Sequence, residues 1–572
     1  MVTDSVYISI FLSLGFIMTK YIFILGGVIS GLGKGVTSGS IGAILKEMGL
    51  NITIKKLDPY LNVDPGTLNP VEHGEVYVTK DGGETDLDLG YYERFAEIEA
   101  TKNNSTSSGK LMFELLKKER KGDFLGKTIT MIPHFTNTIK NFICADSDKY
   151  DVIICEIGGS AGDYEANAFL ESIRQIKQEN ENDAIICFLS YLVYYQASKE
   201  LKTKPTQVGL RQLMSAGLET DLIFLRSEYE MSDVIKEKVA LYGNVKKNDI
   251  IAAYNVSSIY QVPLEYKKEG LIERLRKKLN IQEKKIATFD KWTKLNNQIV
   301  NLKHKITLGL VGKYVELEDA YYSVIEAIKH AGWYYSTKID IVFINARIDS
   351  TRDINEELKN VDCILVPGGF GTSGIEEIIK AITYARENLV PYMGICLGMQ
   401  LAVVEFARNM TGIKNASSSE FGRDTNEFVV DLMTEWKTDD KTIEKRDKDE
   451  DKGGTLRLGS YDTVVSNGSL ANKIYESTNF KERHRHRYEV DIKYKEILES
   501  KGMIFSGLSP DGKLPEIVEI NEFILNEKKV KHPYFIAGQF HPEFNSSPFN
   551  PHPMFKGLIK AALDIKFKER IN

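Results

Sequence analysis

Cysteine is scarce in this sequence, and the five that occur are Cys144, Cys155, Cys187, Cys363 and Cys396. They are scattered along the chain without a Cys-x-x-Cys pair. This spacing fits neither a disulfide framework nor a zinc site. Scattered free thiols are typical of a reducing compartment, so we expect a cytoplasmic protein.

An excess of basic residues is also lacking. The chain has 74 Lys and Arg against 80 Asp and Glu, which gives a net charge of −6. A general nucleic-acid binder would carry a basic footprint, so this class is disfavoured. The hydrophobic content of 42% and charged content of 27% are those of an ordinary soluble globular protein. A chain of 572 residues is too long for one hydrophobic core, so we expect two or more domains.

No hydrophobic run is long enough to cross a bilayer. The apolar stretch 6–17 is too short, and Asp4 precedes it without any Lys or Arg, unlike a signal peptide. Met18 leads directly into a predicted strand. We therefore interpret residues 1–17 as a disordered extension or a mis-set start, and expect no membrane association. The tract 437–452 is nearly all charged and predicts a solvated loop.

A turn of small residues surrounds Cys396. The apolar run 389–395 predicts a short buried strand, and the periodic segment 399–408 predicts a helix. Gly394 and Gly398 would let the chain bend sharply and present the cysteine at the helix N-terminus, which favours a thiolate and can hold an oxyanion. Taken alone, the pattern fits a small buried hydrophobic residue equally well.

Two further segments favour a nucleophile. A predicted strand at 361–366 ends in the glycine loop 367–371, whose N–H groups could bind an oxyanion. Near the C-terminus, His541 and Glu543 place a base and a carboxylate two residues apart. A single His-x-Glu is usually structural, but the ordered set resembles the class I glutamine amidotransferases. That resemblance implies Cys396 as nucleophile, His541 as base and Glu543 as its orienter, releasing ammonia from glutamine.

The same resemblance implies which residues contact the glutamine substrate. Glu420 and Arg487 suit this role because the ammonium and carboxylate of an amino acid each need an opposite charge. The full implied set is Gly369, Leu397, Gly398, Met399, Gln400, Glu420 and Arg487.

The N-terminal half begins with a predicted phosphate-binding loop. A buried strand at 21–25 leads into the glycine-rich segment 26–37 and a helix that runs through Glu47. Glycine N–H groups and the helix N-terminus can bind phosphate, and Lys34 can reach the β- and γ-phosphates. The match to the P-loop pattern is imperfect, because Gly35 stands where a metal-binding hydroxyl belongs and the first glycine is one residue out.

Carboxylates follow this loop at two places. Asp86 and Asp88 lie in a glycine-rich acidic segment, and Glu156 ends an apolar strand at 152–155. Acidic clusters are usually solvated loops. Beside a phosphate site, Asp88 and Glu156 are candidate ligands of Mg²⁺, which prefers carboxylate oxygen. The segment 202–207, Lys-Thr-Lys-Pro-Thr-Gln, is either a solvated turn or a binding site for a second polyphosphate.

Long strings of the chain resemble the CTP synthase family, from about Met18 to near the C-terminus. They include segments 56–60, 73–76, 86–90, 202–207, 257–260, 453–459 and 482–489. The resemblance implies an α/β fold with two doubly wound domains, a P-loop-like synthetase domain and a class I glutamine amidotransferase domain. The predicted bounds are 18–280 for the synthetase domain, 281–305 for a polar linker and 306–572 for the amidotransferase domain.

The resemblance implies an activity and its ligands. ATP would phosphorylate the 4-oxygen of UTP, and ammonia from glutamine, or free ammonia, would then displace the phosphate to give CTP. Mg²⁺ would be the cofactor, GTP the activator and CTP the feedback inhibitor. A homotetramer is implied, with UTP at the subunit junction, and filaments are a possible further assembly.

Family residues are carried onto this chain by motif. For ATP they are Gly31, Leu32, Gly33, Lys34, Gly35, Val36, Lys56 and Asp88. For UTP and CTP they are Ser30, Asp163, Tyr164, Glu165, Lys202, Thr203, Lys204, Pro205, Thr206, Gln207 and Lys238.

The chain departs from the family near the implied pyrimidine site. Ser160, Ala161 and Tyr164 replace the usual Thr, Val and Ile, and Tyr194 replaces a proline. These changes concern CTP sensitivity more than catalysis. Two alternatives remain at this point. One is another glutamine-dependent ATP ligase, against which the 202–207 segment argues. The other is an inactive, filament-forming homologue, against which the intact candidate residues argue.

Overall fold

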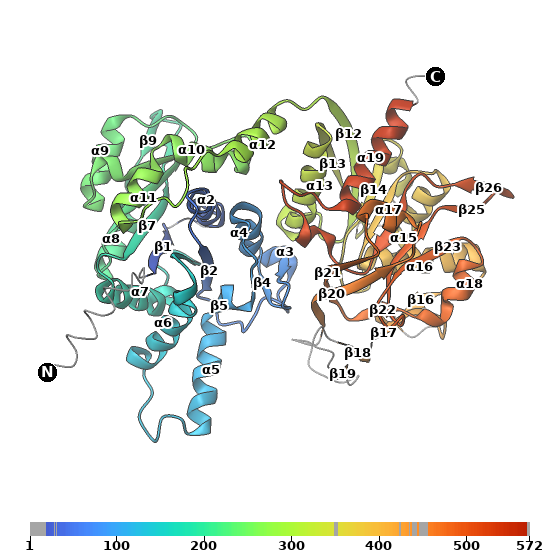
Figure 1. Cartoon of the computed structure of the whole chain (residues 1–572), viewed down its shortest axis with the longest axis horizontal. Helices are drawn as coiled ribbons and strands as arrows, with labels where there is room; N and C mark the ends of the chain where they lie inside the picture. The colour runs from blue at the N-terminus through green and yellow to red at the C-terminus, as the bar shows by residue number, and fades with distance from the viewer. Residues whose placement is uncertain are drawn as a thin grey trace. The chain divides into compact units, whose positions relative to one another are not determined.

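The computed structural model describes residues 19–27, 29, 31–347, 353–422, 425–433, 435–437, 443–445 and 456–568. The chain divides into two compact units (Figure 1). The first unit comprises Met1–Asp64 and Tyr91–Asn296, and the second comprises Pro65–Gly90 and Asn297–Asn572. Within the described ranges, no helix is both long and apolar enough to cross a membrane.

The first unit is built on a seven-stranded sheet in which every pairing is parallel. Its strand order is β11 (Ile250–Tyr254), β10 (Leu222–Ser227), β7 (Ala184–Tyr191), β1 (Lys20–Gly26), β6 (Val152–Ile157), β2 (Ile52–Asp58) and β5 (Ser105–Ser107). The central strands are buried along almost their whole length, because a parallel sheet has both faces covered by helices.

Helices cover both faces of this sheet. On one face, Phe23 of β1 and Ile153 of β6 share a core with residues of α7 and α8. On the other, Gly42 of α2 lies against the side chains of Ile52 and Ile54 of β2. The helices are α2 (Lys34–Glu47), α5 (Ser108–Lys121), α6 (Thr136–Cys144), α7 (Asn167–Glu179), α8 (Lys204–Ser215), α9 (Asp233–Gly243), α10 (Val262–Lys268) and α11 (Leu271–Leu279). This arrangement is the predicted doubly wound α/β fold.

The second unit contains a nine-stranded mixed sheet. Its order is β13 (Thr337–Asn345), β12 (His304–Gly312), β14 (Cys363–Val366), β15 (Tyr392–Ile395), β27 (Phe535–Gly538), β24 (Pro515–Ile520), β23 (Met503–Leu508), β20 (Arg457–Val465) and β21 (Asn479–His486). The first five strands run parallel to one another and the remaining pairings are antiparallel. The parallel part brings the carboxyl ends of β14 and β15 to one edge, where the predicted glycine loop and cysteine lie.

Successive residues of β14 point to opposite faces of this sheet, as the period of a strand requires. Ile364 and Val366 belong to the core beneath α15 (Ile375–Glu387) and α16 (Leu397–Phe406). Cys363 and Leu365 belong to the core beneath α13 (Tyr322–Tyr334) and α19 (Pro553–Lys568). The predicted alternation of buried strand and covering helix is therefore confirmed in this half as well.

Residues 65–90 come from the N-terminal half of the sequence but pack within the second unit. They contain the short strands β3 (Val76–Val78) and β4 (Glu84–Asp86). The N–H of Ser323, at the start of α13, donates to Glu75 Oε2 at 2.8 Å, and Arg485 Nε donates to Glu84 Oε1 at 2.8 Å. The predicted continuous domain 18–280 does not include this placement of residues 65–90 in the second unit.

The segment 281–305 was predicted to be a polar linker. It contains helix α12 (Asp290–Val300), whose Trp292 and Leu295 are buried. Trp292 lies 5.8 Å from the ring of Phe95, which belongs to the first unit. The few apolar residues of this segment are therefore core residues, although they were too sparse to predict a helix. The boundaries at 280 and 305 stay predictions.

Candidate active site

Cys396 lies between the end of β15 and the first residue of α16, as the glycine pattern predicts. Its φ of 52° and ψ of −100° are strained for a residue with a side chain. A Cβ on Gly398 would approach Val366 O to 2.3 Å, and one on Gly394 would approach the backbone of Gly398 to 2.7 Å. Only glycine fits at these two positions. The tight packing therefore fixes the turn that presents the thiol.

His541 and Glu543 lie beside this turn. His541 Nδ1 donates to Glu543 Oε1 at 2.7 Å, and both side chains are buried. The backbone N–H of His541 donates to Arg483 O at 2.7 Å, and that of Cys396 donates to Gly538 O at 2.7 Å. The strands β21 and β27 thus hold the base and the nucleophile by their backbones.

The protonation of His541 reflects opposing effects. Burial lowers its pKa, whereas the charge of Glu543 and hydrogen bonds with Cys396 and Glu543 raise it, with a net rise to about 10. The imidazolium is therefore the favoured form at neutral pH. An imidazolium beside a thiol stabilises the thiolate form of that thiol.

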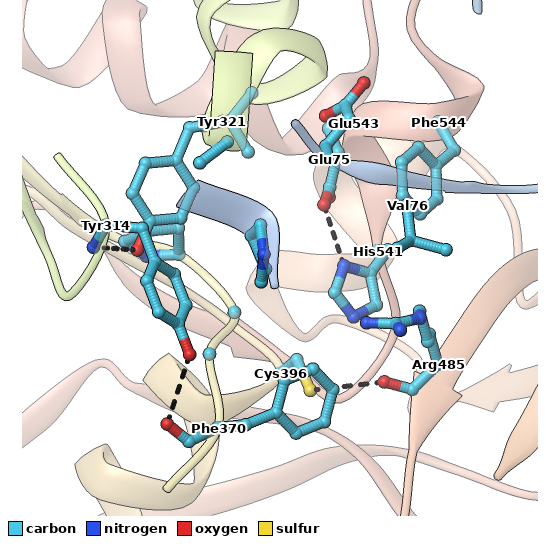
Figure 2. A pocket seen from close by; sticks show the side chains of 16 residues that line it. Glu75, Val76, Tyr314, Tyr321, Phe370, Cys396, Arg485, His541, Glu543 and Phe544 are labelled. Atoms are coloured by element: carbon cyan, nitrogen blue, oxygen red, sulfur yellow. Dashed lines mark hydrogen bonds and ion pairs between the residues drawn. The ribbon is translucent and has the colours of Figure 1, made fainter. Parts of the chain in front are cut away.

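A pocket opens onto these residues (Figure 2). Cys396, His541 and Glu543 line it together with the glycine loop that follows β14. Pro70, Glu75 and Val76 of the 65–90 segment form another part of its wall.

Charged groups gather around the glycine loop. Glu420 accepts a hydrogen bond from the N–H of Gly371 at 2.8 Å. Burial raises the pKa of Glu420, although that N–H group and the charges of Lys313 and Arg487 lower it. Lys313 Nζ donates to the carbonyls of Phe370, at 3.2 Å, and Gly371. Burial lowers the pKa of Lys313 to about 8, opposed by the charge of Glu420 and reinforced by that of Arg347.

The other residues predicted to contact glutamine lie on the same turn and loop. A Cβ on Gly369 would meet Leu397 Cδ2 at 3.3 Å and Lys313 Cδ at 3.6 Å, so the glycine loop lies directly against the start of α16. Leu397, Met399 and Gln400 are buried. The structure thus brings the predicted amidotransferase residues together in one unit.

Three features of this site were missed from the sequence. Lys313 directly follows the carboxyl end of a buried strand. Ligands bind at this position in parallel sheets, so Lys313 could have been predicted as a site residue. Gln539 precedes the His-Pro-Glu motif and directs its amide at Cys396. The wall made by Glu75 and Val76 had no local signal, because it depends on packing between distant parts of the chain.

The phosphate-loop residues lie in the first unit. Lys34 begins α2, and Gly33 before it has a φ of 83°. Lys34 Nζ folds back over Gly26 and donates to Gly159 O at 2.5 Å. Arg226, which the sequence analysis did not select, donates from Nη1 to Leu32 O at 3.0 Å. Two cations, Lys34 and Arg226, thus contact the predicted glycine loop.

Glu156 is the centre of a buried polar cluster in this unit. Ser38 Oγ donates to its Oε2 at 2.9 Å, and Tyr92 OH donates to the same oxygen at 2.6 Å. Lys56 Nζ lies 3.3 Å from Glu156 Oε1 and 3.5 Å from Asp58 Oδ1. The strand end therefore combines carboxylate oxygens with a lysine beside the phosphate loop.

The carboxylates of Glu156 and Asp88 are chemically suitable ligands for Mg²⁺. Among the described residues, no group of three or more His, Cys, Asp or Glu forms a metal cage. Mg²⁺ at nucleotide sites is usually held by one or two carboxylates together with substrate phosphates and water, so a cage is not required. Glu156 meets this description, and Asp88, at the start of α4 (Asp88–Ala96), is a further carboxylate of the right chemistry.

Several candidate pyrimidine-binding residues of segment 202–207 already form hydrogen bonds or ion pairs with other side chains of the protein. Ser190 Oγ donates to Thr206 Oγ1 at 2.9 Å, and Gln207 Nε2 donates to Thr203 Oγ1 at 2.8 Å. Lys202 pairs with Glu200 at 2.5 Å. Lys202 ends the strand β9 (Glu200–Lys202), Thr203 is the N-cap, and residues 204–207 form the first turn of α8, so the segment is not a simple solvated turn.

The remaining pyrimidine candidates lie on exposed turns and helices. Lys238 is exposed on α9, and its charge lowers the pKa of Glu200 after the larger effect of Lys202. Asp163 accepts hydrogen bonds from the N–H and Oγ of Ser160, at 2.6 and 2.7 Å, and Tyr164 and Glu165 are exposed. Ser30 and most of the charged tract 437–452 lie outside the described residues.

Comparisons with known proteins cover both units. A family model described as CTP synthase N-terminus matches residues 20–281, and one described as glutamine amidotransferase class-I matches residues 316–561. The chain is similar to the CTP synthase of Cereibacter sphaeroides, with 47% identity over 553 residues, covering 96% of this chain and 99% of that protein. The CTP synthase of Methanocaldococcus jannaschii is 48% identical over 556 residues, with the same coverages. Among solved structures, a glutaminase domain of Trypanosoma brucei CTPS with bound acivicin matches at 33% identity and a TM-score of 0.38, covering 45% of this chain and 94% of that chain.

Proposed function

Since the chain belongs to the CTP synthase family and converts UTP to CTP with nitrogen from glutamine, we propose that its two units divide this reaction between them. The second unit hydrolyses glutamine, and the first activates UTP with ATP. The observation that carries this proposal is the bond of 2.7 Å between His541 and Glu543 beside the strained Cys396 turn.

The glutaminase step begins with the thiolate of Cys396. It attacks the side-chain carbonyl carbon of glutamine, so that a C–S bond forms and the carbonyl oxygen becomes an oxyanion. The backbone N–H groups of Gly369 and Leu397 stabilise that oxyanion. The protonated His541 gives its proton to the leaving nitrogen, the C–N bond breaks, and ammonia departs from a thioester.

Water completes the cycle. His541, now neutral, takes a proton from water, which attacks the thioester carbon. The C–S bond breaks, and glutamate and the thiolate are restored. Glu543 holds the imidazole in one tautomer and stabilises its charged form throughout. Glu420 and Arg487 bind the ammonium and carboxylate of the substrate, with Gly398, Met399 and Gln400 forming the adjoining wall.

The first unit activates the uracil oxygen. Gly31 to Val36 and the start of α2 bind the ATP phosphates, and Lys34 leaves its carbonyl partner for the γ-phosphate. Lys56 stabilises the charge that develops on the transferred phosphoryl group. Glu156 of this unit would hold Mg²⁺, whose charge would neutralise that of the phosphates, and Asp88 stays the second predicted ligand. Ammonia then displaces phosphate from the 4-phosphorylated UTP to give CTP.

The pyrimidine site and the effectors are inferred from family membership. Segment 202–207, Ser30 and Lys238 bind UTP, and residues 163–165 take part in CTP feedback inhibition. GTP activates the glutaminase, and the working form is a homotetramer that can form filaments. The proposed domain bounds are 18–280 and 306–572, joined by 281–305, with residues 65–90 packed within the second unit. We infer that the protein works in the cytoplasm, in keeping with its scattered free cysteines.

The decisive experiment compares two nitrogen sources. CTP formation is measured from ATP, UTP, GTP and Mg²⁺ with either glutamine or ammonium, using the wild type and Cys396→Ala. We expect the wild type to use both sources and the variant to use ammonium alone, with at least about a 1,000-fold loss of glutamine-dependent activity because the nucleophile is gone.

Retained glutamine use by Cys396→Ala would overturn the assignment of the nucleophile. Loss of both activities in a variant that keeps the wild-type melting temperature would contradict the division between the two units.

A further inference from the structure

Gln539 lies against the reacting sulfur, and the mechanism above does not use it. Its Nε2 is 3.7 Å from Cys396 Sγ, within reach of an N–H···S hydrogen bond. Gln539 is fully buried, with 0% of its surface exposed. Its backbone N–H donates to Glu516 O at 2.9 Å, which fixes the residue at the end of β27.

The orientation of this amide follows from its neighbours. Gln400 Nε2 lies 2.9 Å from Tyr488 O, and a backbone carbonyl can only accept a hydrogen bond. The NH₂ group of Gln400 must therefore face Tyr488. The same NH₂ group lies 3.4 Å from Gln539 Oε1 and can supply its second hydrogen there. With its oxygen held by Gln400, Gln539 turns its NH₂ group toward the sulfur.

A backbone carbonyl is another polar neighbour of the sulfur. Arg485 O lies 3.8 Å from Cys396 Sγ and can accept a hydrogen bond from the thiol. That carbonyl favours the neutral thiol, because it offers no hydrogen to an anion. An N–H donor favours the anion instead. The amide of Gln539 therefore offsets the carbonyl of Arg485.

We propose that Gln539 is a further catalytic residue of the glutaminase, whose side-chain N–H stabilises the thiolate of Cys396 and whose orientation is set by Gln400. The inference rests on the proposed role of Cys396 as nucleophile. It assigns a second role to Gln400, which positions a hydrogen-bond donor in addition to lining the substrate site.

Alkylation of Cys396 by iodoacetamide tests this role without glutamine. The rate is followed on the full-length protein by mass spectrometry of the Cys396 peptide at pH 7.5. Gln539→Met keeps a similar volume and removes the donor. We expect alkylation about 10- to 100-fold slower, since a hydrogen bond to a charged group is lost. Raising the pH should recover most of the rate, because more thiolate forms.

Gln539→Glu serves as the isosteric second variant. It replaces the donor with a group that repels the thiolate, so the loss should equal or exceed that of Gln539→Met. Gln400→Met should slow alkylation by a smaller factor, because the donor remains but is free to turn away. As a control, Ser506→Ala removes a buried hydroxyl from the same sheet and should alkylate at the wild-type rate.

A wild-type melting temperature shows that each variant is folded. A wild-type alkylation rate in folded Gln539→Met or Gln539→Glu would overturn the inference. Failure of the underlying function would look different, because Cys396→Ala would then retain glutamine hydrolysis whatever the Gln539 variants do.

Discussion

The two candidate sites of this chain differ in how far their side chains are already arranged for chemistry. In the second unit, Cys396 and His541 are fixed by backbone bonds to neighbouring strands, and His541 is bonded to Glu543. In the first unit, Lys34 donates to Gly159 O, a bond that a nucleotide phosphate would replace. The candidate glutaminase site is thus prearranged, whereas the proposed phosphate site would be completed by its substrate.

This difference follows from the chemistry that each site performs. A covalent mechanism needs the nucleophile and its base held in one geometry. Phosphoryl transfer depends on cations that surround a highly charged ligand. A lysine can therefore bind a neutral carbonyl in the free protein and contact the phosphate only after the ligand binds. Removing a residue from each site should therefore have different consequences.

The largest effect is expected for Lys34→Met. It removes the lysine that reaches the ATP phosphates, so activation of UTP should fall about 1,000-fold. CTP formation should be lost with either glutamine or ammonium, which separates this variant from Cys396→Ala. The measurement is CTP release with each nitrogen source at saturating ATP. Normal ammonium-dependent activity would contradict the role of Lys34.

A smaller effect is expected for Glu543→Gln, which tests how firmly the glutaminase is prearranged. Glutamine hydrolysis should fall about 100-fold, because the imidazole loses its orienting charge. Ammonium-dependent CTP formation should be unchanged. If glutaminase activity is retained, the arrangement of His541 does not depend on this carboxylate.

The same variant predicts a change in the pH dependence of stability. The pKa of His541 is raised to about 10 in the folded protein, above its ordinary value of about 6.5. Its contribution to stability is therefore full below about pH 6.5 and is lost as the pH rises toward 10. The melting temperature of the wild type should fall more between pH 7 and 10 than that of Glu543→Gln. A comparison between the two proteins cancels the opposite contribution of Lys313.

The smallest effect is expected at the turn near the pyrimidine site. Asp163→Asn removes one of two acceptors that hold Ser160, at 2.6 and 2.7 Å. CTP inhibition should weaken a few-fold, since one hydrogen bond to a charged group is worth about 1.5–3 kcal/mol and the turn can partly relax. Turnover at saturating UTP should be unchanged. An unaltered inhibition curve would remove this turn from the regulatory site.

Local patterns predicted the elements that carry the candidate chemistry. The glycines around Cys396, the strand before Glu156 and the loop before Lys34 could all be identified, because each depends on neighbours within about ten residues. The hydrogen bond from Gln539 to the sulfur could not be predicted, since it depends on Gln400 and Tyr488. The two buried apolar residues of α12 were likewise too few to give a periodic signal.

The packing of residues 65–90 within the second unit has a consequence for folding during protein synthesis. Arg485 and Glu84 are bonded across a separation of 401 residues, and Arg483 and Tyr77 across 406. On a ribosome, this segment emerges long before its partners, and contacts of such long range form late. The glutaminase pocket therefore acquires its wall only when synthesis is nearly finished. A fragment starting at residue 297 would lack this wall, so the C-terminal half of the gene alone does not encode the whole pocket.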